Sequence, residues 1–221
     1  MSDFKDVKQQ IDNTRTLRAI AGGQGRPLFV LVHGADRQFQ NAAYWRPHCQ
    51  WLSGLGSFLA VDMLGHGEST PGGSDALESP VQRAQQVSAI AALLDAHAAG
   101  HLPCVAVGRS YGGRVVLDLA SDRPDLFNAL ILIAPSVDES RLATLPATVT
   151  GTPTLLVWAD DDPVVPAIRR PAVLKAFKHI ESVDMGSIDP PADAPWKAHT
   201  PEIEKPDLFR RRVEAFLASL P

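Results

Sequence analysis

The sequence contains no long apolar run and no basic run. No stretch approaches the roughly 18 consecutive apolar residues of a transmembrane helix. The opening segment, MSDFKDVKQQ, is polar and charged and lacks the apolar core of a secretory signal. The formal net charge is −4, which disfavours binding to the phosphate backbone of a nucleic acid. We therefore expect no membrane span, no secretory leader and no nucleic-acid partner.

Cysteine is scarce as well, with two residues in the chain. Cys104 opens a predicted buried strand, and Cys49 lies far away in a predicted helix. We expect two free, buried thiols, as in a reducing compartment, rather than a disulfide. Together with the polar N-terminus, this predicts a cytoplasmic location. Histidine and acidic residues form no cluster with metal-ligand spacing, so we predict neither a metal nor a cofactor.

The chain does have the length and apolar content of one α/β domain. Its 221 residues are 45% hydrophobic and 21% charged, which predicts a single domain over 1–221 without internal repeats. Short apolar runs alternate with helical patterns, which is typical of a doubly wound, mostly parallel β-sheet with helices on both faces. The predicted strands are two within 7–21, then 28–32, 58–61, 105–107, 129–134, 153–158 and 179–185. The predicted helices cover 41–53, 80–98, a segment beginning near 115, 167–177 and 206–220.

The stretch that organises the chain is CVAVGRSYGGRVV at 104–116. It combines a short strand, a tight turn with Ser110 at the bend and the start of a helix, which is the context that makes a G-x-S-x-G motif informative. A nucleophile that stands clear of the sheet forces its backbone into a sharp turn, so only glycine-sized side chains fit at Gly108 and Gly112. The helix would direct its N-terminal amides at the site, where they favour an anion.

Five ordered segments make nearly the whole chain resemble an α/β-hydrolase-fold serine hydrolase. They are LVHGA at 31–35, VDMLGHGES at 61–69, VGRSYGGR at 107–114, PTLLVWADDDPVVP at 153–166 and AHTPEIEKPDLF at 198–209. The resemblance implies the α/β-hydrolase fold and a carboxylesterase-like enzyme. Many relatives have a lid of several helices, for which the interval 135–152 is too short. We therefore expect a member without a large cap domain.

The resemblance implies a catalytic triad in the family's chain order. Ser110 would be the nucleophile, activated by a base that takes its proton. His199, which lies between the last predicted strand and the final helix, would be that base. Asp162 aligns with the family's acid and would hold the imidazole in the correct tautomer.

Other residues compete for these roles. Asp160 and Asp161 adjoin the predicted acid and are interpreted as solvated loop charges. Asp138 is a rival acid, because some relatives place the acid after the preceding strand. Among the histidines, His33 follows another strand and resembles the family's structural HG pair beside the oxyanion loop, and His66, in the GHG loop, is interpreted as a residue that braces turns.

The resemblance also implies an oxyanion hole made by the backbone amides of Ala35 and Tyr111, each worth about 3 kcal/mol in the transition state. Gly34 matters because the backbone there must approach the substrate oxygen closely. The loop 186–198 is longer than the family's usual link and contains Trp196. It is either a surface insertion or a wall of the acyl site in which Trp196 binds substrate.

These residues predict a serine hydrolase that cleaves acyl esters of small-molecule substrates through an acyl-enzyme. A thioesterase or acyltransferase would use the same triad and change only the leaving group or the acceptor. A non-catalytic binding protein of the same fold is the alternative of a different class, and covalent labelling of Ser110 by a fluorophosphonate separates it from an enzyme. The sequence indicates no particular oligomeric state.

Overall fold

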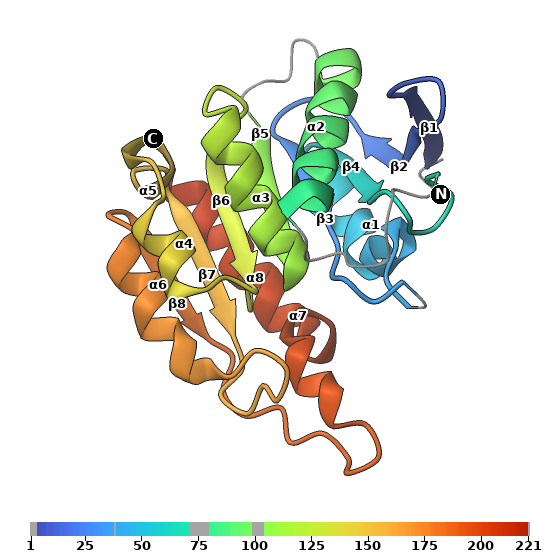
Figure 1. Cartoon of the computed structure of the whole chain (residues 1–221). Coiled ribbons are helices and arrows are strands. Elements are labelled where there is room, and N and C mark those ends of the chain that lie inside the picture. The colour runs from blue at the N-terminus through green and yellow to red at the C-terminus, as the bar shows by residue number, and fades with distance from the viewer. Residues whose placement is uncertain (1–3, 38, 71–79, 99–103, 221) are drawn as a thin grey trace.

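A computed structural model describes residues 4–37, 39–70, 80–98 and 104–220. Its centre is an eight-stranded sheet in the order β1-β2-β4-β3-β5-β6-β7-β8 (Figure 1). The strands are β1 (Lys5–Gln10), β2 (Thr16–Gly23), β3 (Leu28–Val32), β4 (Ser57–Asp62), β5 (Cys104–Arg109), β6 (Phe127–Ile133), β7 (Thr154–Trp158) and β8 (Ile180–Asp184). The β1–β2 and β2–β4 pairs are antiparallel and the others parallel. The predicted doubly wound, mostly parallel sheet is confirmed.

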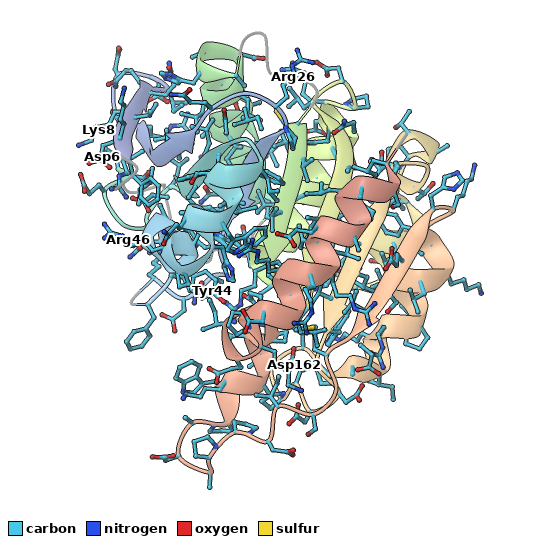
Figure 2. The ribbon with its side chains drawn as sticks, turned by 180° about the vertical axis from the view of Figure 1, so that it is seen from behind. Asp6, Lys8, Arg26, Tyr44, Arg46 and Asp162 are labelled. Carbon is cyan, nitrogen blue, oxygen red and sulfur yellow. The ribbon has the colours of Figure 1, made fainter. Side chains whose placement is uncertain are left out.

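Helices cover both faces of this sheet. Figure 1 shows α2, α3 and α6 in front of the strands, and Figure 2, from behind, shows α1 and α8 on the other face. The helices are η1 (Ala42–Trp45), α1 (Arg46–Leu55), α2 (Pro80–His97), α3 (Tyr111–Asp122), α4 (Glu139–Ala143), α5 (Ala147–Thr150), η2 (Ala167–Arg169), α6 (Arg170–Ala176), η3 (Pro195–His199), α7 (Pro201–Glu204) and α8 (Pro206–Ser219). Within the ranges described above, none is both long and apolar enough to cross a membrane.

The strand β3 shows why the central strands are continuous apolar runs in the sequence. Leu28, Val30 and Val32 belong to the core cluster beneath α2 and α3. Phe29 and Leu31 belong to the cluster beneath α1 and α8. Successive side chains of a strand point to opposite faces, so a sheet covered on both sides needs an apolar residue at every position.

The parallel strands direct three predicted site segments to one edge of the sheet. Gly34 follows β3, Ser110 follows β5 and Asp162 follows β7. Ligands of open α/β sheets bind outside the carboxyl ends of the strands. The topology therefore gathers these segments at the edge where a site is expected.

Two connections differ in detail from the sequence-based prediction. The chain between β6 and β7 forms the short helices α4 and α5, which have too few residues to produce a periodic pattern. They are the only helices of that connection, all of which is described, so no large cap domain stands between these strands. The predicted loop over 186–198 leads into η3 rather than remaining irregular throughout.

Both cysteines are buried and free, as predicted. Cys49 lies on α1 and Cys104 begins β5. Burial raises the pKa of each thiol to about 12. Neither side chain is therefore a thiolate near neutral pH.

Candidate active site

Ser110 stands at the turn between β5 and α3 in a conformation that few residues adopt. Its φ is 52° and its ψ is −121°, in a region that favours glycine. Backbone hydrogen bonds hold this geometry on both sides. The Ser110 amide donates to the Ile133 carbonyl at 2.8 Å, and its carbonyl accepts from the amides of Gly113 (3.0 Å) and Ser136 (2.9 Å). The residue lies at the carboxyl edge of the sheet and is 9% exposed.

The two glycines of the motif are required by their neighbours, as predicted. A Cβ atom on Gly108 would lie 2.7 Å from the Gly112 oxygen and 2.7 Å from the Cα atom of Gly113. A Cβ atom on Gly112 would lie 2.3 Å from the carbonyl oxygens of Val32 and His33. The start of α3 thus packs backbone against backbone on β5 and on the end of β3.

Asp162 and His199 form a buried pair at the same edge. Asp162 Oδ2 lies 2.7 Å from His199 Nδ1, and each residue is 4% exposed. The other carboxylate oxygen, Oδ1, accepts from the amides of Val164 and Val165, each at 2.9 Å. Asp162 is therefore fixed by its own loop and offers an acceptor to Nδ1–H, which leaves Nε2 of a neutral imidazole with its lone pair.

The Nε2 atom of His199 is buried and has no hydrogen-bond partner in the described part of the chain. Arg109, which precedes the serine, connects the two halves of the site: its Nη2 atom donates to the His199 carbonyl at 3.0 Å. The structure thus brings Ser110, Asp162 and His199 to one edge and pairs the acid directly with the histidine. It leaves Ser110 and His199 without a direct hydrogen bond.

The rival acid Asp138 is engaged elsewhere. It caps the N-terminus of α4 by accepting from the Arg141 amide at 2.8 Å, and it pairs with Arg114 at 3.3 Å. Hydrogen bonds from the Ser140 hydroxyl and the Arg141 amide lower the pKa of Asp138 to about 2. This carboxylate stabilises a helix end, and the histidine pairs with Asp162 instead.

The interpretation of Asp161 as a solvated loop charge is wrong. Its carboxylate accepts from the amides of Ile188 (3.0 Å) and Asp189 (2.8 Å) and from the Ser187 hydroxyl (2.8 Å). It therefore ties the acid loop to the start of the long segment that leads to His199. A loop carboxylate with several amides in reach is stabilised by hydrogen bonds that a sequence does not display.

The two predicted oxyanion amides flank the elbow. Tyr111 is the first residue of α3, directly after Ser110. The Ala35 amide lies in the loop after β3 and donates to no acceptor among the residues described. An amide in this state is available to a developing oxyanion.

His33 orients the peptide group that contains the Ala35 amide. Its Nδ1 lies 2.7 Å from the Gly34 carbonyl, and its Nε2 accepts from the Met63 amide at 3.1 Å. Both bonds require a neutral imidazole, and burial lowers the pKa of His33 to about 3. Since the carbonyl and N–H of a trans peptide point in opposite directions, anchoring the Gly34 oxygen aims the Ala35 N–H away from His33. The structural role predicted for His33 is confirmed.

Gly34 leaves room for a neighbouring side chain. A Cβ atom there would lie 2.7 Å from Arg109 Nη1 and 3.6 Å from the Ser110 Cβ atom. The Gly34 amide donates to Gln40 Oε1 at 3.3 Å. The close approach at this glycine is thus made by Arg109, and a contact of Gly34 with substrate stays a prediction.

A buried ion pair beside the site was not predicted. Arg109 Nε lies 3.5 Å from Glu202 Oε1, and the Tyr44 hydroxyl donates to the same oxygen. The Arg109 guanidinium lies 5.2 Å from the centre of the Tyr44 ring. Burial raises the pKa of Glu202, although Arg109 acts in the opposite direction. The available signal was an arginine inside an apolar strand, at the variable position before the serine.

A family model described as serine aminopeptidase, S33, matches residues 23–150, more than half of the chain. The chain belongs to this family. Its fold is that of the α/β-hydrolases, as its sequence predicted.

Curated relatives of this S33-family chain include a lipase and a hydrolase of a succinate derivative. It is 38% identical over 158 residues to lipase LipV of Mycobacterium tuberculosis, covering 65% of this chain and 56% of the lipase. It is 31% identical over 125 residues to (E)-2-((N-methylformamido)methylene)succinate hydrolase of Acinetobacter baylyi, covering 56% of this chain and 43% of that protein. The chain spans about half the length of these relatives.

Solved structures share the fold of this S33-family chain. A 2-hydroxy-6-oxo-6-phenylhexa-2,4-dienoate hydrolase from Rhodococcus gives a TM-score of 0.80 at 17% identity, covering 99% of this chain and 100% of that chain. A crystal structure of a predicted CIB-like hydrolase from Thermoplasma acidophilum gives a TM-score of 0.75 at 21% identity, covering 98% and 99%. At these identities the likeness concerns the fold alone.

Trp196 lies on η3 of this S33-family member, a few residues before His199. It is 56% exposed, and it makes no ring contact with the described part of the chain. A half-exposed indole can contribute apolar area to a ligand. Its predicted substrate-binding role stays a prediction.

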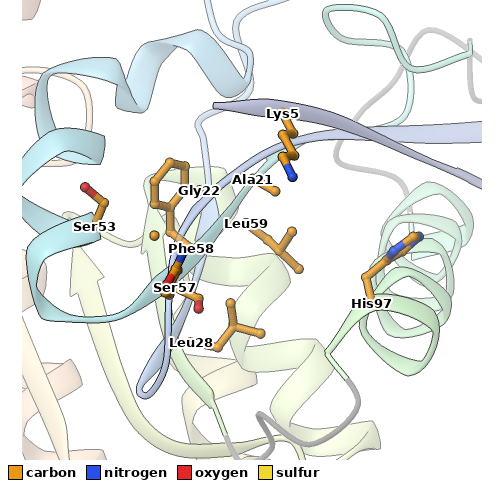
Figure 3. A pocket seen from close by; sticks show the side chains of 11 residues that line it. Lys5, Ala21, Gly22, Leu28, Ser53, Ser57, Phe58, Leu59 and His97 are labelled. Atoms are coloured by element: carbon orange, nitrogen blue, oxygen red, sulfur yellow. The ribbon is translucent and has the colours of Figure 1, made fainter. Parts of the chain in front are cut away.

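Two hollows of this S33-family chain lie at opposite edges of the sheet. The smaller, of about 320 Å³, is lined by Tyr111 and Ser136 among others and therefore adjoins the elbow. The larger, of about 680 Å³, is lined by Leu28, Ser57 and His97 among others (Figure 3). Since Leu28 and Ser57 begin β3 and β4, the larger hollow lies at the amino-terminal edge, away from Ser110.

Proposed function

We propose that this chain is a carboxylesterase-like serine hydrolase that cleaves acyl esters of small substrates through an acyl-enzyme. Ser110 Oγ attacks the ester carbonyl while His199 Nε2 takes the hydroxyl proton and then gives it to the leaving alcohol. Asp162 stabilises the imidazolium. The amides of Ala35 and Tyr111 stabilise the tetrahedral oxyanion. Water then attacks the acyl-enzyme by the same proton transfers in reverse and releases the acid.

The Asp162–His199 pair is the observation that carries this proposal. The 2.7 Å contact at Nδ1 leaves a buried Nε2 with no other partner in the described residues. The strained serine stands at the same edge. Hydrogen bonds between catalytic groups are often long or poorly aligned without substrate and tighten in the complex, so the missing Ser110–His199 hydrogen bond does not exclude these roles. The lipase name of one relative also supports ester chemistry.

A fluorophosphonate probe and turnover of 4-nitrophenyl esters test the proposal together. The chain should be labelled at Ser110 and should hydrolyse 4-nitrophenyl acetate or butyrate. Ser110→Ala and His199→Ala should each lower kcat by several orders of magnitude, and the double variant should be little worse, because the residues act as a unit. Circular dichroism should show that each variant retains the fold.

Ser53→Ala and His97→Ala are matched controls, since both residues line the hollow at the opposite edge; they should retain labelling and turnover. A folded chain that neither labels nor hydrolyses these esters contradicts the proposal and favours a binding protein. Cleavage of acyl thioesters without cleavage of oxygen esters would assign the same residues to a thioesterase.

We further propose that the acyl site accepts short chains. No large cap stands between β6 and β7, and the hollow beside the elbow, of about 320 Å³, is small for a ligand pocket. Since each buried methylene contributes about 0.8 kcal/mol, kcat/KM should be greatest for acyl chains of roughly two to six carbons. If Trp196 covers the acyl chain, Trp196→Ala should lower kcat/KM for butyrate more than for acetate. Equal losses would make the loop a surface insertion.

A further inference from the structure

The hollow beside the elbow is lined by cationic side chains. Arg83 from α2, Arg114 from α3 and Arg169 from η2 line it together with Asp138. Three guanidinium groups and one carboxylate leave a net positive charge on the lining. A pocket of this charge favours an anionic ligand group.

This pocket, of about 320 Å³, adjoins the proposed nucleophile. Tyr111, which also lines it, directly follows Ser110. Ser136, a third lining residue, donates its amide to the Ser110 carbonyl at 2.9 Å. A ligand in the pocket would therefore contact two residues that adjoin Ser110, one along the chain and one through a backbone hydrogen bond.

Two described carboxylates lie among these cations and are already engaged by arginines. Asp118, below the pocket, lies 3.2 Å from Arg114, 3.6 Å from Arg83 and 2.8 Å from Arg141. Arg114 also lies 3.3 Å from Asp138. Among the described residues, Asp118 and Asp138 are thus paired with other arginines, and neither forms an ion pair with Arg169.

Arg169 is the cation without a partner in this group. Its side chain is exposed, and it makes no ion pair or side-chain hydrogen bond with the described residues. Its backbone is held in place, because its amide donates to the Pro166 carbonyl at 3.0 Å. The neighbouring Arg170, in contrast, pairs with Asp160 at 3.1 Å.

We propose that this pocket binds a carboxylate on the acyl chain of the substrate, so that the enzyme prefers half-esters of dicarboxylic acids over uncharged esters. The inference rests on the proposed ester hydrolysis for its position in the reaction. A guanidinium binds a carboxylate through two parallel N–H···O bonds, and Arg169 has its donors available. Arg114 and Arg83 line the same pocket.

The test compares two esters of equal acyl length, the 4-nitrophenyl monoester of adipic acid and 4-nitrophenyl hexanoate. The wild-type ratio of kcat/KM, adipate ester over hexanoate ester, should exceed one. Arg169→Gln should lower that ratio about tenfold, as loss of one charge-assisted contact predicts. Asp138→Asn removes the carboxylate of the pocket but keeps a side chain that caps α4, so it should raise the ratio.

Arg211→Gln is the matched control, because Arg211 is an exposed arginine on α8, on the opposite face of the sheet; it should leave the ratio unchanged. A second readout does not need turnover: calorimetry of adipate binding to the Ser110→Ala protein, with and without Arg169→Gln. Weaker adipate binding on loss of Arg169 upholds the carboxylate site even if no ester is cleaved. Ester turnover with the same ratio in wild type and Arg169→Gln overturns the carboxylate site while the hydrolase proposal stands.

Discussion

The two halves of the proposed triad are held in place by different means. On the nucleophile side the restraint is steric and local: Ser110 lies between β5 and α3, where Gly108 and Gly112 let backbones touch. On the base side it is polar and acts over long distances in the sequence. His199 is held at its ring by Asp162 and at its carbonyl by Arg109, whose position is 90 residues earlier.

This difference predicts what each half can tolerate. A packed elbow responds to added volume, because neighbouring backbone atoms cannot move aside cheaply. A polar network responds to a change of charge or proton position, because its buried members have no water to replace a lost partner. Substitutions that alter one property and preserve the other separate the two halves.

The largest effect is expected on the base side from Asp162→Asn, which preserves shape and changes only the hydrogen-bonding groups. An amide NH₂ facing His199 would favour the tautomer with the proton on Nε2, which cannot accept the serine proton. The opposite rotamer would point the NH₂ at the amides of Val164 and Val165. We expect kcat for a 4-nitrophenyl ester to fall about ten-thousandfold. Asp138→Asn should cost far less, and the reverse result would mean that the acid has been misassigned.

The next largest effect is expected from Arg109→Met, because this substitution leaves the Glu202 carboxylate buried without its cation. Removing one partner of a buried pair costs about 3–5 kcal/mol of unfolding free energy, measured here in urea. The variant also frees the His199 carbonyl, so kcat should fall more than KM rises.

Glu202→Gln separates these two effects of Arg109. Burial raises the pKa of Glu202, which means that a charge there is costly, and an uncharged amide should cost less than the loss of Arg109. Arg109→Met/Glu202→Gln should therefore be more stable than Arg109→Met while its kcat stays low. A double variant no more stable than Arg109→Met would contradict the buried pair.

On the nucleophile side, Gly112→Ala adds one methyl group and no charge. Its Cβ atom would lie 2.3 Å from two carbonyl oxygens, and we expect a loss of about 3 kcal/mol in unfolding free energy. Gly54→Ala is the matched control, because a Cβ atom there meets nothing within 4 Å inside α1. It should gain up to about 1 kcal/mol of helix propensity. Equal urea midpoints for the two variants would remove the steric half of the comparison.

The smallest expected effect is on the loss of stability at acidic pH, and it involves a histidine outside both halves of the triad. His48 is fully buried on α1, and burial lowers its pKa to about 4. As pH falls below about 6.5 the unfolded chain takes up a proton that folded His48 refuses, so stability is lost down to pH 4 at about 1.4 kcal/mol per pH unit. His48→Phe should make the acid limb of the urea stability curve shallower by that slope. An unchanged slope would show that the pKa of His48 is the same in the folded and unfolded states.

The sequence was sufficient for those parts of the fold and site that depend on local patterns. Apolar runs predicted the central strands, because a strand covered on both faces has no polar position. The glycines of the elbow predicted its close packing for a steric reason, and Gly108 and Gly112 confirm it. The short helices α4 and α5 could not be predicted, since four or five residues do not complete a periodic pattern.

Contacts between distant segments were beyond the same reasoning. The sequence around Glu202 does not predict that this residue is buried beside Arg109, because the two residues are far apart in the chain and meet only in the folded structure. Asp161 was misinterpreted for a related reason. Its partners are the backbone amides of Ile188 and Asp189, and every residue type except proline has such an amide, so the sequence does not mark them as partners. Charged residues in loops are therefore the class for which position alone predicts least.

The two buried thiols lie on opposite faces of the sheet, so their reactivity can report local opening of each face. Cys49 packs in the cluster beneath α1 and α8, and Cys104 in the cluster beneath α2 and α3. Iodoacetamide reacts with exposed thiolates, so alkylation at either position requires the covering layer to open. The two alkylation rates report the opening of each layer separately, without an introduced label. Coincident rates would mean that both layers separate from the sheet as one cooperative unit.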